Sequence, residues 1–309
     1  MASARTVLVL SENWTMTSPR DLPALVRIAC QAEQAGVDTV MLSEHVVLGP
    51  DSSAAGLMGN PRDYAAPGNQ DPATPWPDSI VLASAIAAAT STLRVALAAV
   101  IAPLRHPLLL AKQLATLDLL AQGRLVVQPT VSWSAHEYQS LGVPFSKRGA
   151  ILDEQLQAMT AAWTDTPAHF QGSFFGFRDV YLEPKPHRPG GPAMWFGGQS
   201  LHDALLRRIV RYGDGFHPFG SPTPQELAAL RQAMVAAGRD PAQLELVGGI
   251  RGQFPDAHST ASIDQALEQV PAQLAAGYTS ICFKPSMYTD DAADIPALCR
   301  HVVERIAAL

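Results

Sequence analysis

The chain has 309 residues, of which 47% are hydrophobic and 16% are charged, and its formal net charge is −6. This composition excludes a disordered or low-complexity chain, which would carry more charge and fewer apolar residues. The acidic balance provides no basic surface for a phosphodiester backbone, so we expect no nucleic-acid partner.

Eight short, continuously apolar segments predict strands that are buried on both faces, as in a parallel sheet. They span residues 6–10, 39–42, 94–102, 124–131, 193–197, 214–219, 244–250 and 280–285. Helical segments alternate with these strands. Their predicted starts lie near Pro19, Asp78, Pro107, Lys147, Ser200, Thr223, Ser262 and Asp291.

Capping residues support these helix boundaries. Ser18 precedes Pro19 and Thr223 precedes Pro224, as at helix amino ends. Helix ends are predicted at four glycines, Gly36, Gly123, Gly238 and Gly277. Strict alternation of strands and helices favours an α/β fold of the (β/α)8 TIM-barrel type, and we expect a single domain over residues 1–309.

Two segments are long for barrel loops. Residues 46–77 follow the second strand and show no helical or strand period, so we expect a loop that covers the pocket and sets specificity through Met58, Tyr64 and Trp76. Residues 164–192 precede the fifth strand and mix aromatic residues with Gly and Pro, which predicts a partly ordered excursion.

Neither cysteines nor apolar runs indicate a disulfide scaffold, a metal site or a membrane span. Cys30, Cys282 and Cys299 are odd in number and far apart, so we expect buried small hydrophobes. No apolar run reaches membrane-spanning length, and the first fourteen residues lack the features of a secretory signal. We therefore expect a cytoplasmic protein with no membrane partner.

A barrel builds its active site at the carboxyl ends of its strands. The polar and aromatic residues expected there are Glu12, Asn13, Trp14, Ser43, Glu44, His45, Arg105, His106, Thr130, Ser132, Trp133, His136, Gly197, Gly198, Gln199, Ser200, His217, Arg251 and Lys284. Few of them are acids and none form a metal-like cluster. The set suits a planar organic cofactor better than a metal ion.

His45 is the strongest catalytic candidate, because an imidazole can donate a hydrogen bond to a carbonyl or transfer a proton near neutral pH. The alternative is a histidine that only supports the loop. Its neighbour Glu44 is either a second proton-handling group or a carboxylate that caps the turn. His106, before Pro107, is either functional or a helix-initiating residue.

The segment WFGGQS, residues 195–200, reads as a strand, a glycine pair and a serine that opens a helix. Exposed backbone N–H groups and the helix dipole would make an anion site there, although such a turn is also ordinary in barrels. The chain contains neither a Walker A nor a GxGxxG motif. His136 and Glu137 do not form a zincin motif, since residue 140 is Ser.

The ordered motifs resemble the bacterial luciferase-like oxidoreductases, a barrel family that includes flavin monooxygenases and enzymes that use the deazaflavin coenzyme F420. The segments that carry the resemblance are AEQAGVDTVMLSEHV, LRHPLLLAKQLATLDLLAQGRL, SWSAHEYQSLGVPFSKRGAILDEQL and FQGSFFGFRDVYLEPKPHRPGGPAMWFGGQS. The resemblance places His45 at the family's active-site histidine position. It also implies a non-prolyl cis peptide near Ala98–Ala99 and a homodimer.

The resemblance implies a cofactor site and an activity. The residues expected to bind the cofactor are Ala98, Ala99, Thr130, Gly197, Gly198, Gln199 and Ser200. We expect F420-dependent hydride transfer to or from a small organic substrate, in which His45 polarises or protonates the substrate and Trp133 walls the pocket. Glu12 or Glu44 would be the second proton-handling group.

Two alternatives stay open. One is a monooxygenase that uses reduced FMN and O2, supplied by a separate reductase. The other is a cofactorless ligand-binding barrel, because strand four reads Gln128-Pro129-Thr130-Val131-Ser132-Trp133 where the family typically has glycines.

Overall fold

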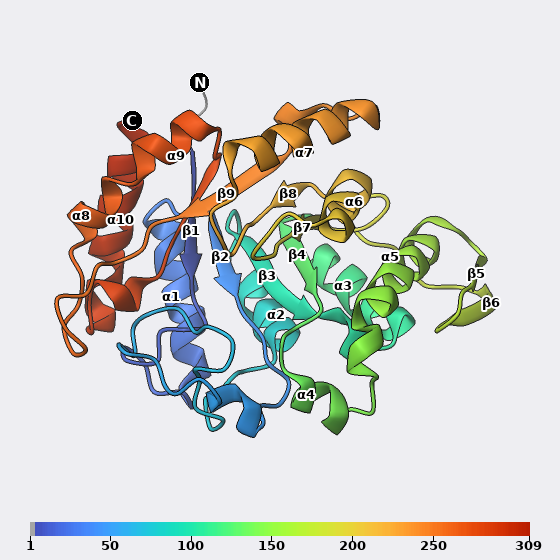
Figure 1. Cartoon of the computed structure of the whole chain (residues 1–309), viewed down its shortest axis with the longest axis horizontal. Coiled ribbons are helices and arrows are strands. Elements are labelled where there is room, and N and C mark those ends of the chain that lie inside the picture. The colour runs from blue at the N-terminus through green and yellow to red at the C-terminus, as the bar shows by residue number, and fades with distance from the viewer. Residues whose placement is uncertain (1–3) are drawn as a thin grey trace. The chain divides into compact units, whose positions relative to one another are not determined.

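The computed structural model describes residues 4–309, and its eight principal strands form a closed parallel barrel in the order β1-β10-β9-β8-β7-β4-β3-β2 (Figure 1). These strands are β1 (Arg5–Val9), β2 (Thr39–Leu42), β3 (Arg94–Ile101), β4 (Leu125–Thr130), β7 (Ala193–Phe196), β8 (Gly215–Phe216), β9 (Glu245–Gly249) and β10 (Ser280–Phe283). Each overlaps one predicted segment. The predicted TIM-barrel fold is confirmed.

The helices follow the predicted alternation, with two differences. They are α1 (Leu22–Gln34), α2 (Ser79–Ala89), α3 (Pro107–Leu120), α4 (Ala135–Ser140), α5 (Arg148–Thr164), α6 (Asp203–Tyr212), α7 (Pro224–Ala236), α8 (Ile263–Leu267), α9 (Val270–Ala276) and α10 (Ile295–Ala307). The short helix α4 was not predicted. The segment that begins near Ser262 contains two helices, α8 and α9, instead of one.

Helix α10 begins at Ile295 instead of near Asp291. Two other predicted helix starts are also wrong. Helix α1 is capped by Asp21, whose Oδ1 accepts from Ala24 N at 3.1 Å, and not by Ser18. Helix α6 begins at Asp203, where His202 Nδ1 accepts from Leu205 N at 3.3 Å, so Ser200 is not its cap. In both cases a later side chain reaches the free backbone N–H groups of the first turn.

Other predicted boundaries are confirmed. Thr223 and Glu226 form a capping box at the start of α7, with Thr223 N donating to Glu226 Oε2 at 2.8 Å. The four predicted glycine stops all have left-handed backbone, with φ of +87°, +79°, +74° and +95° at Gly36, Gly123, Gly238 and Gly277.

The described residues divide into two compact units. The first contains the residues up to Met41, Asn60–Arg62 and Ala193–Leu309; the second contains Leu42–Gly59 and Asp63–Pro192. The expected single domain over residues 1–309 stays a prediction. The N-terminal segment used to predict localisation begins with three residues that lie outside the described part.

In the first unit, α1 and α10 lie against each other and α10 packs on β1 (Figure 1). Leu8 on β1 and Val302 on α10 are both fully buried. In the second unit, α2 packs on β3 and α3, and α3 packs on α5. Continuous apolar sequence in these strands follows from burial on both faces.

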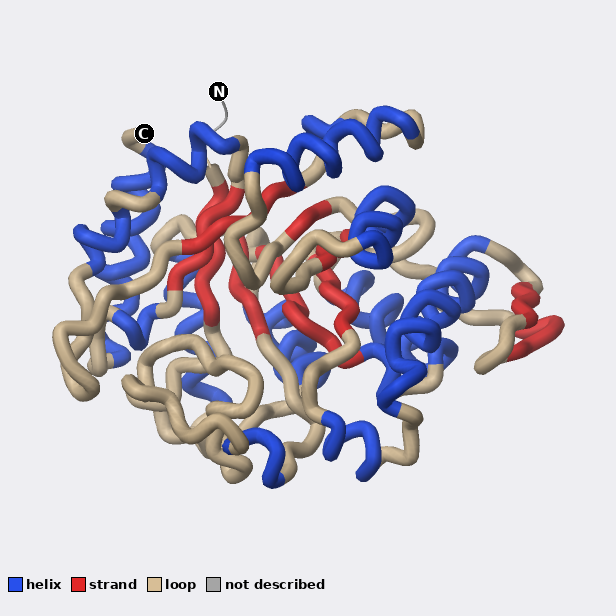
Figure 2. The backbone as a smooth tube through the Cα atoms, in the orientation of Figure 1, coloured by secondary structure: helices blue, strands red, loops and turns tan. Residues whose placement is uncertain are grey.

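The segment between β2 and α2 is almost entirely loop, apart from a short 3-10 turn at Pro50–Ser53 (Figure 2). Its residues Asn60–Arg62 belong to the first unit. Arg62 donates to both carboxylate oxygens of Asp290, at 2.8 and 2.6 Å. Asn60 Nδ2 donates to the carbonyl oxygens of Asp256 and Ser259 at 3.1 and 3.0 Å.

The predicted excursion before the fifth barrel strand contains an antiparallel hairpin, β5 (Ala168–Gln171) and β6 (Gly176–Val180), which lies beyond α5 in Figure 1. Glu154 on α5 holds its tip, since its carboxylate accepts from the backbone N–H groups of Ser173, Phe174 and Phe175 at 2.7, 2.7 and 2.6 Å. Partial order in this segment is confirmed.

The expected cis peptide between Ala98 and Ala99 is present. The three thiols are free: Cys282 and Cys299 are buried, as predicted, and Cys30 is half-buried. Burial raises the pKa of the Cys299 thiol to about 12. No helix within residues 4–309 combines the length and the apolar character that a bilayer crossing requires.

Candidate functional site

His45 lies just after β2, in an aromatic slot of the second unit. Its ring centroid is 5.3 Å from that of Trp76 and 5.5 Å from that of Trp133, and both indoles meet it edge-on at 68° and 74°. Only 8% of the His45 side chain is exposed. Two large apolar walls therefore leave the imidazole few orientations, and they exclude water from its sides.

A buried carboxylate meets the same imidazole. Glu137 on α4 is fully buried, and its Oε2 lies 3.5 Å from His45 Nδ1 and accepts from Ser132 Oγ at 3.2 Å. Its Oε1 accepts from the backbone N–H groups of Val46 and Val47 at 2.6 and 3.3 Å. One carboxylate thus contacts the histidine ring, its chain neighbours and the end of β4.

Short helix α4 is fixed in place by contacts with the loop after β2. Ser134 caps the helix by accepting from Glu137 N at 3.3 Å, and its hydroxyl donates to Asp51 Oδ2 at 3.0 Å. Asp51 Oδ2 also accepts from His136 N at 3.2 Å. A Cβ at Gly49 would lie 2.2 Å from the His136 ring, so only glycine permits this close approach.

Glu44 points into a different network. Its carboxylate accepts from Arg105 at 2.7 and 2.9 Å, from Ser79 Oγ at 2.6 Å and from Ile101 N at 3.0 Å. Its side chain is 1% exposed. This geometry corresponds to a carboxylate that ties the strand ends together and leaves both oxygens occupied.

The residues expected beneath a cofactor ring lie on β3 and β4. The pairing register shifts between Ala98 and Val100, so Ala99 lies at an irregularity of the β3 edge. Ala98 is buried, whereas Ala99 and Thr130 are half-buried. Thr130 pairs with Ile101 at the carboxyl end of β4. Because Ala98 and Ala99 are alanines, only methyl groups project from this part of β3.

The turn expected to bind phosphate lies in the first unit, after β7. Gly198 O accepts from Phe219 N at 3.0 Å, and a Cβ at Gly198 would lie 3.1 Å from Leu205 Cδ2. Ser200 is exposed, and α6 starts only at Asp203, with that acid in its first turn. The expected contribution of the helix amino end is therefore not supplied at Ser200.

Glu12 lies beyond β1, beside a buried cation. Its Oε2 is 3.9 Å from Lys284 Nζ, and Lys284 has no exposed side-chain surface. The ammonium also lies 5.7 Å from the centroid of the Trp14 ring. Asn13 joins the two strand ends, because its Nδ2 donates to Val9 O at 2.7 Å and its Oδ1 accepts from Ser286 N at 2.9 Å.

His217, beyond β8, is the most strongly perturbed histidine of the described residues. It packs edge-on against Trp195 and Phe219, with centroids 6.0 and 5.3 Å apart. Burial lowers the pKa of its imidazole to about 4, and Glu245 opposes that change only in part. His217 is consequently neutral at physiological pH.

The other strand-end candidates have structural contacts. His106 caps α3, with Nδ1 accepting from Leu108 N at 3.3 Å, and its ring meets Phe175 at 5.6 Å. This corresponds to the helix-initiating alternative. Within residues 4–309, no three His, Cys, Asp or Glu side chains are grouped as a metal site would require.

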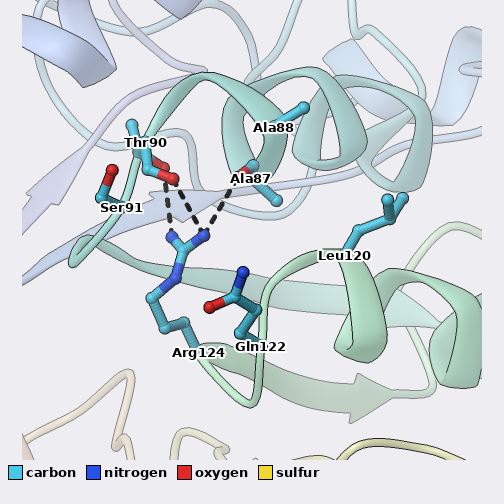
Figure 3. A pocket seen from close by; sticks show the side chains of 7 residues that line it. All are labelled: Ala87, Ala88, Thr90, Ser91, Leu120, Gln122 and Arg124. Carbon is cyan, nitrogen blue, oxygen red and sulfur yellow. Dashed lines mark hydrogen bonds between the residues drawn. The ribbon is translucent and has the colours of Figure 1, made fainter.

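A cavity of about 250 Å³ lies at the opposite end of the strands, where α2 leads into β3 and α3 leads into β4 (Figure 3). Arg124 lines it and donates to Ala87 O at 3.0 Å, to Thr90 O at 3.0 Å and to Thr90 Oγ1 at 3.1 Å. It binds the carbonyl groups at the end of α2. In this fold that end serves stability.

Sequence reasoning missed two residues of the aromatic slot. Trp76 was expected only to cover the pocket, and Glu137 was considered only as part of a failed zinc motif. The Ser-x-x-Glu spacing of Ser134 and Glu137 does signal a helix start. It does not reveal that the Glu137 carboxylate turns towards a histidine 92 residues away.

The sequence model of the luciferase-like monooxygenase family matches residues 5–294. The chain belongs to this family. An uncharacterised protein from Mycobacterium tuberculosis (strain H37Rv) is 33% identical over 214 residues, which cover 68% of this chain and 73% of the relative.

Two further similarities name cofactors. The FMNH2-dependent dimethylsulfone monooxygenase of Pseudomonas putida is 34% identical over 126 residues, 40% of this chain and 34% of that protein. The coenzyme F420-dependent tetrahydromethanopterin reductase of Methanopyrus kandleri shares the fold, with a TM-score of 0.70, 12% identity and coverage of 99% of this chain and 100% of that chain. The first resembles part of this chain in sequence and the second shares its fold, and their names give two different cofactors.

Proposed function

We propose that this luciferase-like protein is an F420-dependent oxidoreductase that transfers a hydride to or from a small organic substrate. The observation that carries the proposal is the imidazole of His45, held between Trp76 and Trp133 with Glu137 at its Nδ1. Adding a hydride to a carbonyl also requires a proton. A buried, oriented imidazole in an apolar slot is suited to supply it.

The residues on β3 and β4 fit a planar ring. Ala98 and Ala99 present only methyl groups beside the register shift of β3, and Thr130 offers a hydroxyl at the end of β4. The backbone N–H groups of residues 197–199 and the exposed Ser200 hydroxyl suit a phosphate group. When bound, the deazaflavin supplies the hydride acceptor or donor, and the protein supplies orientation and electrostatics.

His45 holds or moves the proton of the substrate oxygen, while Trp133 and Trp76 exclude water and wall the substrate. Glu12 is the second proton-handling candidate, because its carboxylate lies beside Lys284 and its side chain is 11% exposed. Glu44 is assigned to positioning, since four donors occupy its oxygens.

The second candidate is a monooxygenase that uses reduced FMN and O2. The FMNH2-dependent relative favours it, since that relative is 34% identical over 126 residues. This function would require a separate reductase as a partner.

Titration of the purified protein with F420 and with FMN, followed by tryptophan fluorescence, tests the proposal. We expect saturable quenching by F420, with FMN binding at least tenfold more weakly; Trp133→Phe should reduce the signal while an exposed-site control, His258→Gln, leaves it unchanged. Tighter binding of FMN would favour the second candidate. No saturable response to either compound would refute both.

The catalytic assignment has its own test. His45→Ala should lower turnover by 10²-fold or more, the usual contribution of a general acid or base, while cofactor affinity stays within about twofold. Unchanged kcat would remove His45 from the reaction.

We also propose that the protein is a homodimer that pairs through α2 and α3. These adjoining helices direct apolar side chains outward: Val81 is 70% exposed and Leu109 is 56% exposed. Burial of such a face against a second copy would remove apolar surface from water.

A further inference from the structure

We propose that Glu137 is a positioning residue that fixes His45 in the tautomer with the proton on Nδ1, so that Nε2 is the nitrogen available for proton transfer. The inference deepens the proposed function and rests on it for the catalytic role of His45. The tautomer itself follows from contacts that involve no cofactor.

The first step is the contact between the ring and the carboxylate. Glu137 Oε2 lies 3.5 Å from His45 Nδ1, and both side chains are shielded, with 0% and 8% exposed. A carboxylate oxygen accepts hydrogen bonds and does not donate them. The neighbouring nitrogen is therefore favoured as N–H, and the second nitrogen of a neutral imidazole then carries the lone pair.

The second step is the fixed orientation of the carboxylate. Its Oε1 is held by Val46 N at 2.6 Å and Val47 N at 3.3 Å, and its Oε2 by Ser132 Oγ at 3.2 Å. The carboxylate cannot rotate without breaking these contacts. Because Val46 follows His45 directly in the chain, the same group fixes both the ring nitrogen and the backbone that carries the ring.

The third step concerns the ring itself. Trp76 and Trp133 pack edge-on against His45 at the centroid distances given above. This packing opposes a ring flip that would exchange Nδ1 and Nε2. The two indole rings and the Glu137 carboxylate together define one orientation of the His45 ring. Glu44, the adjacent acid in the chain, is engaged by Arg105 and does not contact the imidazole.

This geometry predicts the effect of an isosteric change. In Glu137→Gln the side-chain oxygen must stay on Val46 N and Val47 N, because an amide NH2 group there would face two donors. The NH2 group then faces His45 Nδ1, which must accept. The substitution should therefore reverse the tautomer and place the proton on Nε2, while the backbone contacts persist.

Long-range ¹H–¹⁵N correlation spectra of the full-length, cofactor-free protein with ¹⁵N-labelled histidine would measure this. Spectra are recorded on the alkaline plateau of the imidazole titration, and His45→Gln identifies the His45 signals among the nine histidines. We expect a protonated Nδ1 in the wild type and a protonated Nε2 in Glu137→Gln. Asp51→Asn is the matched control, since Asp51 binds the amino end of α4 without contacting His45, and it should keep the wild-type tautomer.

A wild-type His45 protonated on Nε2 would overturn the proposal, and this holds even if Glu137→Gln does not fold. An unchanged tautomer in a folded Glu137→Gln would also overturn it. Failure of the cofactor titrations described above, with the tautomer reversed as expected, would refute the proposed function and leave the role of Glu137 in place.

Discussion

Replacement of His217 should reduce the acid sensitivity of the folded protein. Burial lowers the pKa of this imidazole to about 4 in the folded state, from an ordinary value of 6.5. Between these two values the unfolded chain binds a proton at His217 and the folded chain does not. Stability is therefore lost as the pH falls below 6.5, and the loss levels off below about 4.

The magnitude follows from the same two values. One pKa unit corresponds to about 1.4 kcal/mol, so the full effect is about 3 kcal/mol, of which about 2 kcal/mol is present at pH 5. For a chain of this length, about 2 kcal/mol corresponds to a change in Tm of about 3 °C. At pH 8 the imidazole is neutral in both states and contributes no pH dependence.

The assay is thermal unfolding of the wild type and of His217→Gln at a series of pH values from 8 to 5. The decrease in Tm over this range should be smaller in the variant by about 3 °C. His258→Gln, at an exposed position, should retain the wild-type decrease. Parallel curves for the wild type and His217→Gln would refute the argument that buried His217 is neutral because of its surroundings.

Two further predictions concern stability and assembly. Arg105→Leu leaves the Glu44 carboxylate buried without its bidentate partner, so it should lower the free energy of unfolding by about 3–5 kcal/mol in urea titrations, and a loss below 1 kcal/mol would contradict the assigned role of this pair. Val81→Glu with Leu109→Glu should convert the proposed dimer to a monomer in light-scattering measurements, and an unchanged mass would exclude the α2–α3 face as the interface.

The sequence predicted the barrel well because parallel strands buried on both faces must be continuous apolar runs. All eight strand segments were located by that property, and glycines with positive φ marked four helix ends. The errors occur where two start signals compete. Ser18 and Ser200 are plausible caps, but Asp21 and His202 reach the free N–H groups instead.

The candidate site was less accessible to sequence reasoning. His45 could be selected because imidazole chemistry and a strand end coincide. Glu137 could not, because its partners come from the loop after β2 and the end of β4, and α4, which carries it, spans only Ala135–Ser140. So short a helix with a polar sequence shows no apolar period.

The hydrogen bonds made by Asn60 and Arg62 have a consequence for how the sequence of this protein could change in evolution. Hydrogen bonds to Asp290, Asp256 and Ser259 pin the middle of the segment between β2 and α2. These hydrogen bonds divide the segment into two shorter arms, one before Asn60 and one after Arg62, and each arm has its own loop-closure entropy. Insertions or deletions between Gly56 and Asn60 would leave the contacts of Val46, Val47 and Asp51 with α4 in place and the arm that carries Trp76 at its original length, so new substrate preferences could arise there without changing the surroundings of the His45 imidazole.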